Sequence, residues 1–198
     1  NLTQSLELLK SLGLKAAAVT SPLKKRLFEI AKERDRSCHA FEAANTLVLN
    51  ESGELKVWNT DYLGAEFLFR GFENLSCAVV GGGGTQEVIK HAMPQATFYS
   101  ARKLEKTSGI EQGEYKVVVW AAGGSVQELQ EKFLPASCQN PKFLIDLDYR
   151  ENSTGRAVAT YLKLQAETKK LKYVPGHKMF VKQAKAQQDI WREFFGLR

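Results

Sequence analysis

Residues 75–85 read LSCAVVGGGGT, and this stretch decides the fold. The nearly continuous apolar run at 75–80 is typical of a strand buried on both faces of a parallel sheet. Four glycines follow the run, and a helical pattern continues over 85–91. A strand, a glycine loop and a helix in this order let the backbone approach a phosphate group closely, with free N–H groups near the helix N-terminus. We therefore expect a dinucleotide-binding loop here, although the same glycines would also suit a tight turn without a ligand.

The loop departs from the strict glycine pattern in two places. Gln86 occupies the third glycine position, so the match is to a variant of the pattern. Glu87, in the first turn of the expected helix, would repel a phosphate nearby. The Glu87 charge predicts a weakened affinity for the cofactor.

Residues 100–103, Ser-Ala-Arg-Lys, follow the next expected strand and contain no acid. An Asp or Glu at this position would bind the ribose 2′-OH of NAD, whereas an Arg accommodates the 2′-phosphate of NADP. Arg102 therefore favours NADP as the cofactor. If Arg102 and Lys103 are ordinary loop charges, NAD remains the alternative.

Alternation of strands and helices continues after the glycine loop. Apolar runs predict strands at 97–100, 115–122 and 142–149. Such alternation implies right-handed crossovers and a parallel sheet. We expect an α/β fold with a doubly wound, Rossmann-like cofactor lobe at 72–171.

The preceding residues predict a second, smaller α/β lobe. Helices are expected at 4–12, 22–34 and 61–71, a short buried strand at 16–20, and a hairpin of strands 46–50 and 55–59 around a glycine-containing turn. Apolar residues at helical spacing predict a last helix at 177–195. We expect a substrate lobe at 1–71, completed by the C-terminal segment 172–198.

Composition excludes several classes of protein. The 198 residues carry 28 Lys+Arg against 22 Asp+Glu, a formal charge of +6, and 43% are apolar, which is ordinary for a globular protein. The basic charge is diffuse, which argues against nucleic acid as a partner, and no apolar run approaches the ~20 residues of a membrane span. Cys38, Cys77 and Cys138 are odd in number and widely spaced, and the three histidines lack metal-ligand spacing. We expect no metal and a cytoplasmic location.

Polar residues stand at the junctions of the first lobe. Thr20 and Lys24 lie between an expected strand and helix, Asn45 precedes a hairpin strand, and Asp61 follows the other. Each has an ordinary structural interpretation taken singly: Lys24 is a solvated charge, Asn45 a turn residue and Asp61 a helix N-cap.

Together these residues form a resemblance. The motifs are VTxPxK (19–24), ANT (44–46), NTDxxG (59–64), GGGG (81–84), DxxYxxxxT (146–154) and GxxMxxxQA (176–184). With these motifs in this order, the sequence resembles shikimate dehydrogenase over about 180 of the 198 residues. The resemblance implies an NADP-dependent oxidoreductase of the shikimate pathway to the aromatic amino acids, which interconverts 3-dehydroshikimate and shikimate by hydride transfer.

The resemblance also implies roles for single residues. Lys24 and Asp61 match the catalytic pair that handles the proton of the reacting hydroxyl, where an ammonium stabilises the developing alkoxide. The substrate-binding positions are Thr20, Asn45, Tyr149 and Gln183, and the cofactor-binding positions are Gly81, Gly82, Gly83, Gly84, Thr85, Ser100, Arg102 and Gly176.

Departures from the family leave alternatives open. The chain starts after the family's first strand and its Ser-x-Ser motif, so we expect an N-terminally shortened substrate lobe. In the cofactor lobe, residues 120–123 (Trp-Ala-Ala-Gly) replace a stretch that is polar in the family. One alternative is a quinate/shikimate-type dehydrogenase that uses NAD. Another is a catalytically impaired member that acts as a binding module. The sequence is compatible with a chain that forms part of a larger fused polypeptide. It is also compatible with either a monomer or a homodimer that pairs through a sheet edge.

Overall fold

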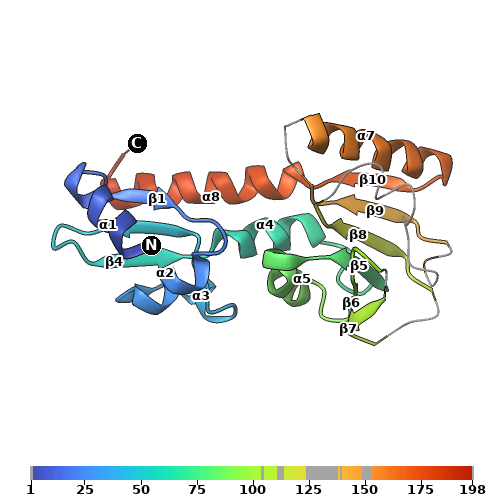
Figure 1. Ribbon diagram of the computed structural model, residues 1–198, viewed down its shortest axis with the longest axis horizontal. Coiled ribbons are helices and arrows are strands. Elements are labelled where there is room, and N and C mark those ends of the chain that lie inside the picture. Colours follow the sequence, from blue (N-terminus) through green and yellow to red (C-terminus); the bar gives the residue numbers. More distant parts are fainter. Residues whose placement is uncertain are drawn as a thin grey trace. The chain divides into compact units, whose positions relative to one another are not determined.

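A computed structural model describes residues 2–103, 105–110, 114–123, 138, 140–148 and 153–197. The chain divides into two compact units: the first comprises Asn1–Gly64 with Val181–Arg198, and the second comprises Ala65–Phe180. The boundaries fall inside helices α4 (Thr60–Phe69) and α8 (His177–Phe195). Each unit has its own sheet (Figure 1).

The first unit is built on a four-stranded sheet of order β1-β3-β4-β2. Its elements are α1 (Leu2–Ser11), β1 (Ala16–Ala18), α2 (Lys24–Ile30), β2 (Glu33–Arg34), α3 (Arg36–His39), β3 (Thr46–Leu49) and β4 (Leu55–Trp58). The predicted hairpin is confirmed, because β3 and β4 pair antiparallel. β1 adds antiparallel to β3, and β2 adds parallel to β4.

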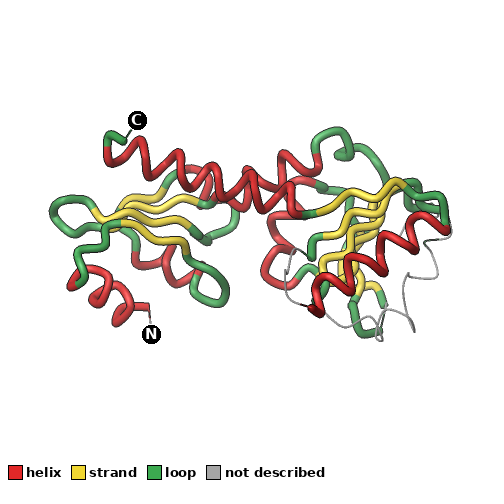
Figure 2. Tube along the Cα trace, turned by 90° about the horizontal axis from the view of Figure 1, so that it is seen from above, coloured by secondary structure: helices red, strands yellow, loops and turns green. Residues whose placement is uncertain are grey.

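One face of this sheet is covered by the first three helices. Leu47, Leu49 and Val57 lie on this face and are buried together with Leu6 of α1 and Leu27 of α2. Burial of each such side chain contributes about 1.5–3 kcal/mol. Residues 181–195 of α8 lie on the side of the sheet opposite α2 (Figures 1 and 2). The sheet is therefore covered on both faces.

Two predicted elements of this unit are wrong in extent. The strand at 16–20 ends at Ala18 and is half exposed or exposed rather than buried, because β1 is an edge strand. The helix at 22–34 begins at Lys24 and ends at Ile30, because Ala31 is extended and Glu33–Arg34 pair with β4.

Among the described residues of the second unit, six strands form one sheet of order β10-β9-β8-β5-β6-β7. Its elements are β5 (Cys77–Gly81), a 3₁₀ turn (Gly83–Thr85), α5 (Gln86–Ala92), β6 (Thr97–Tyr99), β7 (Lys106–Ser108), β8 (Val117–Ala121), β9 (Phe143–Asp146), α7 (Ser153–Thr168) and β10 (Lys172–Pro175). Every neighbouring pair is parallel except β6–β7. The predicted α/β class with a parallel sheet is confirmed.

Helices cover both faces of this second sheet. Val158 and Leu162 of α7 pack on a face that includes Val80 and Val118, and Figure 2 shows α7 lying along the sheet. On the other face, Lys90 of α5 lies 5.6 Å from the centre of the Phe98 ring. Strands β7 and β10 and helix α7 have no counterpart among the predicted elements. In the described part of the chain, no helix has both the length and the apolar character to cross a membrane.

Candidate active site

The β3–β4 hairpin brings two polar motifs of the first unit to one place. Asn45 precedes β3, and its backbone N–H donates to the carbonyl oxygen of Trp58, the last residue of β4, at 3.0 Å. Helix α4 begins directly afterwards at Thr60, with Asp61 in its first turn. Residues 45 and 59–61 are therefore neighbours because antiparallel pairing joins the ends of the hairpin.

Lys24 reaches the same place from helix α2, which it begins. The Ala44 N–H donates to the Lys24 carbonyl oxygen at 3.0 Å and so ties the start of the helix to the hairpin. Lys24 Nζ then donates to Asp61 Oδ2 at 2.5 Å, with the two side chains 19% and 7% exposed. An ion pair so shielded from water is screened little by salt.

The Asp61 carboxylate is held on its other side as well. Its Oδ1 accepts a hydrogen bond from Asn45 Nδ2 at 2.8 Å. The Asp61 N–H donates to Asn59 Oδ1 at 3.1 Å, so Asn59 caps the first turn of α4. The Asp61 carboxylate lies at the positive end of the α4 helix dipole. Both carboxylate oxygens are thus fixed by partners.

The orientation of the Asn45 side-chain amide follows from the groups that donate hydrogen bonds to it. Oδ1 accepts from the Thr60 N–H at 2.8 Å, from Thr60 Oγ1 at 3.2 Å and from Thr46 Oγ1 at 2.8 Å. A backbone N–H only donates, so it requires the oxygen on that side and leaves Nδ2 facing Asp61. All these side chains are buried. Lys24, Asn45 and Asp61 are therefore brought together in one network.

The other predicted substrate-binding residues do not join this network. Thr20 is exposed, and its carbonyl accepts from the Leu23 N–H at 3.0 Å in the turn before α2. Gln183 of α8 is half buried. Within the described residues, neither side chain hydrogen-bonds to Lys24 or Asp61. Tyr149 lies outside the described residues.

Three side chains in the network were not predicted. Thr46 and Thr60 are part of the quoted motifs, but their hydroxyls had no assigned role. Gln187 of α8 also joins, through its donation to Thr46 Oγ1 at 3.1 Å. Gln187 stands four residues after Gln183, which places both on one helix face, and this spacing is the signal that could have found it.

In the second unit, the glycine loop stands where the strand order reverses. From β5 the chain passes to β6 on one side, and β8 later adds on the other side of β5. Open α/β sheets bind ligands outside the carboxyl ends of the strands at such a point. Gly81 ends β5 and pairs with Ala121, which ends β8.

The backbone of the loop requires glycine. Gly81, Gly82 and Gly83 have φ values of 88°, 118° and 39°, a region that L side chains rarely adopt. A Cβ on Gly81 would lie 2.9 Å from Ala121 O, whereas one on Gly83 would meet nothing within 4 Å. Thr85 closes the turn with N–H and Oγ1 donations to Gly82 O, each at 2.7 Å. The loop is therefore tightly packed behind and open at Gly83, which fits a bound phosphate.

Two more predicted cofactor positions lie at this carboxyl edge. Ser100 directly follows β6, and Arg102 is exposed in the turn between β6 and β7. Because β6 is the parallel neighbour of β5, this turn lies beside the glycine loop. The arrangement places a cation near the loop.

Gly176, a third position, directly follows β10. Its N–H donates to the Asp146 carbonyl oxygen at 2.5 Å, and the same oxygen leaves no room for a Cβ on residue 176. The Tyr173 hydroxyl donates to Asp146 Oδ2 at 2.8 Å. Burial, together with the Asp146 charge, raises the pKa of Tyr173 well above its usual value, so the hydroxyl keeps its proton. The ends of β9 and β10 are joined rigidly.

The Glu87 charge at the loop has a local partner. Glu87 Oε1 accepts from Lys90 Nζ at 3.0 Å, one turn along α5. The ammonium offsets the repulsion of a phosphate that the sequence predicts for Glu87.

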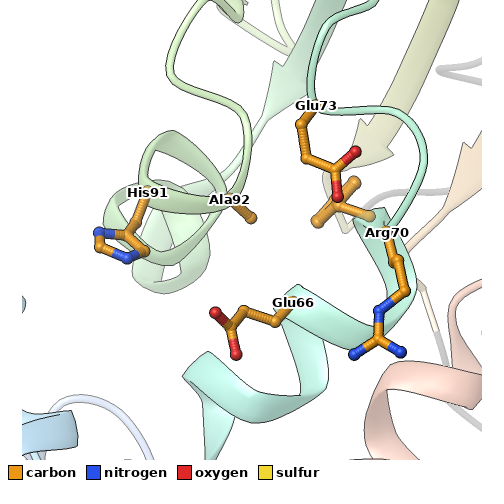
Figure 3. A pocket seen from close by; sticks show the side chains of 6 residues that line it. Glu66, Arg70, Glu73, His91 and Ala92 are labelled. Carbon is orange, nitrogen blue, oxygen red and sulfur yellow. The ribbon is translucent and has the colours of Figure 1, made fainter.

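A separate pocket of about 250 Å³ lies in the second unit, and none of the predicted site residues lines it. Figure 3 shows its ionisable side chains, with Glu66 from α4, Arg70 and Glu73 from the turn that follows, and His91 from α5. Within the described residues, no group of three or more His, Cys, Asp or Glu side chains is placed to hold a metal ion.

Comparison with curated proteins finds sequence similarity to shikimate dehydrogenases. The chain is 27% identical to the shikimate dehydrogenase (NADP(+)) of Actinobacillus pleuropneumoniae over 92% of this chain and 74% of that protein. It is 26% identical to a shikimate dehydrogenase-like protein of Haemophilus influenzae, over 56% of this chain and 41% of that protein, so this match spans less than half of the relative's length. No family model matches the chain.

Solved structures share the fold along nearly the whole chain. Quinate dehydrogenase from Corynebacterium glutamicum in complex with NAD is 21% identical, with a TM-score of 0.73 over 100% of this chain and 78% of that one. Shikimate 5-dehydrogenase from Thermus thermophilus in complex with NADP(H) and shikimate is 20% identical, with a TM-score of 0.70 over 95% and 76%. A chorismate mutase/shikimate 5-dehydrogenase fusion protein from Clostridium acetobutylicum is 21% identical, with a TM-score of 0.69 over 97% and 75%.

The sequence match and the fold agree with each other and with the motif order. The match to a shikimate dehydrogenase runs along 92% of the chain, and the Rossmann-like sheet is the one that the solved dehydrogenases share. The chain therefore resembles the shikimate dehydrogenase family in both sequence and fold.

Proposed function

We propose that the chain is an NADP-dependent oxidoreductase that interconverts 3-dehydroshikimate and shikimate. The observation that carries the proposal is the 2.5 Å pair of Lys24 and Asp61, fixed by Asn45 in a largely buried network. A partly buried ammonium held by a carboxylate is suited to exchange a proton with a hydroxyl that is oxidised to a ketone.

The chain's own residues account for the proton. When the ketone is reduced, its oxygen gains negative charge, and the Lys24 ammonium donates a proton to it as the C–O bond becomes single. Asp61 keeps the ammonium in place. In the oxidation direction the neutral amine takes the hydroxyl proton back. Solvent water restores the protonation state of Lys24 after each turnover.

The carboxyl edge of the second sheet supports a nicotinamide dinucleotide as cofactor. Gly81–Thr85 would hold its phosphates, and Arg102 with Ser100 would hold a 2′-phosphate. The backbone at Gly176 would lie next to the nicotinamide. The cofactor would supply or accept the hydride. The NADP-named relative in Actinobacillus pleuropneumoniae supports NADP, whereas the NAD complex of quinate dehydrogenase keeps NAD as the second candidate.

A polyhydroxylated acid suits the first unit as substrate. Thr20, Asn45, Gln183 and Tyr149 would hydrogen-bond its hydroxyls and carboxylate. A site built to bond hydroxyls rejects analogues that lack them. Quinate is the alternative substrate, because it offers the same hydroxyl pattern to Lys24.

A coupled assay tests the proposal. The purified chain is mixed with shikimate or quinate and with NADP⁺ or NAD⁺, and reduced nicotinamide is followed by absorbance. We expect turnover with shikimate and NADP⁺ that is lost in Lys24→Met. If the chain binds both compounds by calorimetry but shows no turnover with any pair, it is a binding module and the proposal is wrong.

A further inference from the structure

Gln187 begins a relay of hydrogen bonds that ends on Asp61. Its Nε2 donates to Thr46 Oγ1 at 3.1 Å and to the Asn45 carbonyl oxygen at 3.3 Å. Thr46 Oγ1 donates to Asn45 Oδ1 at 2.8 Å, and Asn45 Nδ2 donates to Asp61 Oδ1 at 2.8 Å. All four residues belong to the first unit. The C-terminal helix is thereby connected to the carboxylate that holds Lys24.

Gln187 decides where the Thr46 hydroxyl proton goes. A hydroxyl has one proton and two lone pairs, and an amide N–H only donates. The Gln187 donation therefore occupies a lone pair of Thr46 Oγ1 and leaves the proton to be given elsewhere. Its nearest acceptor is Asn45 Oδ1 at 2.8 Å, while Thr60 Oγ1 lies at 3.5 Å.

The direction of that proton matters for Asp61. Each donor on Asn45 Oδ1 polarises the amide and strengthens the N–H that it gives to Asp61. The network is buried, and hydrogen bonds are stronger in such a low-dielectric environment. Loss of the Thr46 donation would weaken the Asn45–Asp61 bond and loosen the carboxylate.

Helix α8 is well placed to hold Gln187 against the sheet. One turn further along, Trp191 Nε1 donates to the Leu47 carbonyl oxygen at 3.3 Å. Gln187 and Trp191 thus contact consecutive residues of β3. The reach of the Gln187 amide to Thr46 is set by this anchored helix.

We propose that Gln187 is a positioning residue, which acts through Thr46 and Asn45 to keep the Asp61 carboxylate in place for Lys24. The inference rests on the proposed function only where turnover is concerned, because the hydrogen-bond relay itself is independent of substrate. An amide donor is required at residue 187. A carboxylate would accept the Thr46 proton and withdraw it from Asn45, and an apolar side chain would give no donor.

Side-chain amide NMR tests the relay without any activity. In Gln187→Met and Gln187→Glu, we expect hydrogen exchange of the Asn45 Nδ2 protons to quicken about threefold to tenfold, as the loss of one net hydrogen bond implies. Gln188→Met, the same change at the exposed neighbouring position, should leave it unchanged. No change in the Gln187 variants, or an equal change in Gln188→Met, would overturn the proposal.

A double-mutant cycle separates a relay from general loosening of the helix. In a Thr46→Val background the effect of Gln187→Met on Asn45 should vanish, because the hydroxyl that transmits it is gone. In Thr46→Ser, which keeps the hydroxyl and guards against misfolding of the valine variant, the effect should persist. An undiminished effect in Thr46→Val would mean that Gln187 acts by packing alone.

Steady-state kinetics test the effect of the relay on turnover. With shikimate and NADP⁺ we expect Gln187→Met to lower kcat about threefold to tenfold and to change KM less than about twofold, since no substrate contact is removed. A raised KM with unchanged kcat would make Gln187 a substrate-binding residue and refute the positioning role. If the unaltered chain shows no turnover, the proposed function fails, while the NMR result still decides the relay.

Discussion

Lys24 Nζ lies 2.5 Å from Asp61 Oδ2 although 37 positions separate the two residues in the sequence. The Asp61 carboxylate cannot turn away from the ammonium without losing the Asn45 hydrogen bond at its other oxygen. A fixed carboxylate keeps the ammonium in one position, which is the arrangement that proton exchange with a single substrate hydroxyl requires.

Removal of the ammonium should abolish most of the activity. We expect Lys24→Met to lower kcat by about 10²–10⁴-fold, the range for loss of a general acid–base group. Lys25→Met removes the same charge from the exposed neighbour and should retain kcat within about twofold, as surface changes usually do. Steady-state rates of both variants give the answer. Equal losses in the two variants would contradict a special role for Lys24.

Two glycines of the loop should respond differently to alanine. Gly81→Ala places a Cβ 2.9 Å from Ala121 O at a φ of 88°, so we expect a loss of about 2 kcal/mol or more in the free energy of unfolding. Gly83→Ala meets no neighbour within 4 Å and should cost about 1 kcal/mol from its φ of 39°.

The affinity for the cofactor, unlike the stability, should be sensitive to the change at Gly83. The new methyl of Gly83→Ala projects into the open side of the loop, so we expect the Kd for NADP⁺ to rise about tenfold or more, a loss of about 1.4 kcal/mol. Urea unfolding and fluorescence titration on the same variants separate the two effects. Unchanged NADP⁺ affinity in folded Gly83→Ala would mean that phosphates do not bind at this loop.

Arg102 should determine the preference between dinucleotides. A charge-assisted hydrogen bond to a phosphate is worth about 1.5–3 kcal/mol, so Arg102→Gln should weaken NADP⁺ binding by about tenfold to a hundredfold and leave NAD⁺ binding unchanged. Lys163→Gln removes the same charge from an exposed position of α7 and serves as the control. A parallel fall for NAD⁺ and NADP⁺ in Arg102→Gln would assign Arg102 to general attraction of anions.

Buried thiols should make the protein less stable in alkali. Burial raises the pKa of Cys38 to about 12 and that of Cys77 above its usual value. Above pH ~9 the unfolded chain loses these thiol protons while the folded chain keeps them, so the free energy of unfolding falls by up to about 1.4 kcal/mol per pH unit for each thiol.

Urea midpoints measured between pH 7 and pH ~10.5 check this expectation, since the upper limit stays near the usual lysine pKa. Cys38→Ala should show a shallower decline than the unaltered chain, whatever its stability at pH 7. An identical slope in both proteins would show that the Cys38 thiol is accessible to water in the folded state.

The fold followed from patterns that involve many residues. The apolar run before Gly81 and the alternation around the 51–54 turn predicted the parallel sheet and the hairpin. The short strands β7 and β10 were not predicted because neither has a clear apolar pattern: β7 is Lys-Thr-Ser, and β10 includes a proline. The helix expected to reach Arg34 stops at Ile30, because pairing of residues 33–34 with β4 outweighs local helix propensity.

The candidate site was predicted only in part, for a geometric reason. The motifs named Lys24, Asn45 and Asp61, yet no spacing along the chain shows that Asn45 stands between α2 and α4. That follows from the hairpin, which brings the two ends together. Gln187 was not predicted, because a helical pattern indicates the helix face on which a residue lies but not the hydroxyl to which its side chain donates.

All the groups that orient the Asp61 carboxylate come from the first unit, and the glycine loop comes from the second. Substitutions in the loop therefore break none of the hydrogen bonds that hold the Lys24–Asp61 pair in place. Under the proposed function, coenzyme preference can therefore be altered by substitutions in the second unit while the residues that exchange the proton stay unchanged.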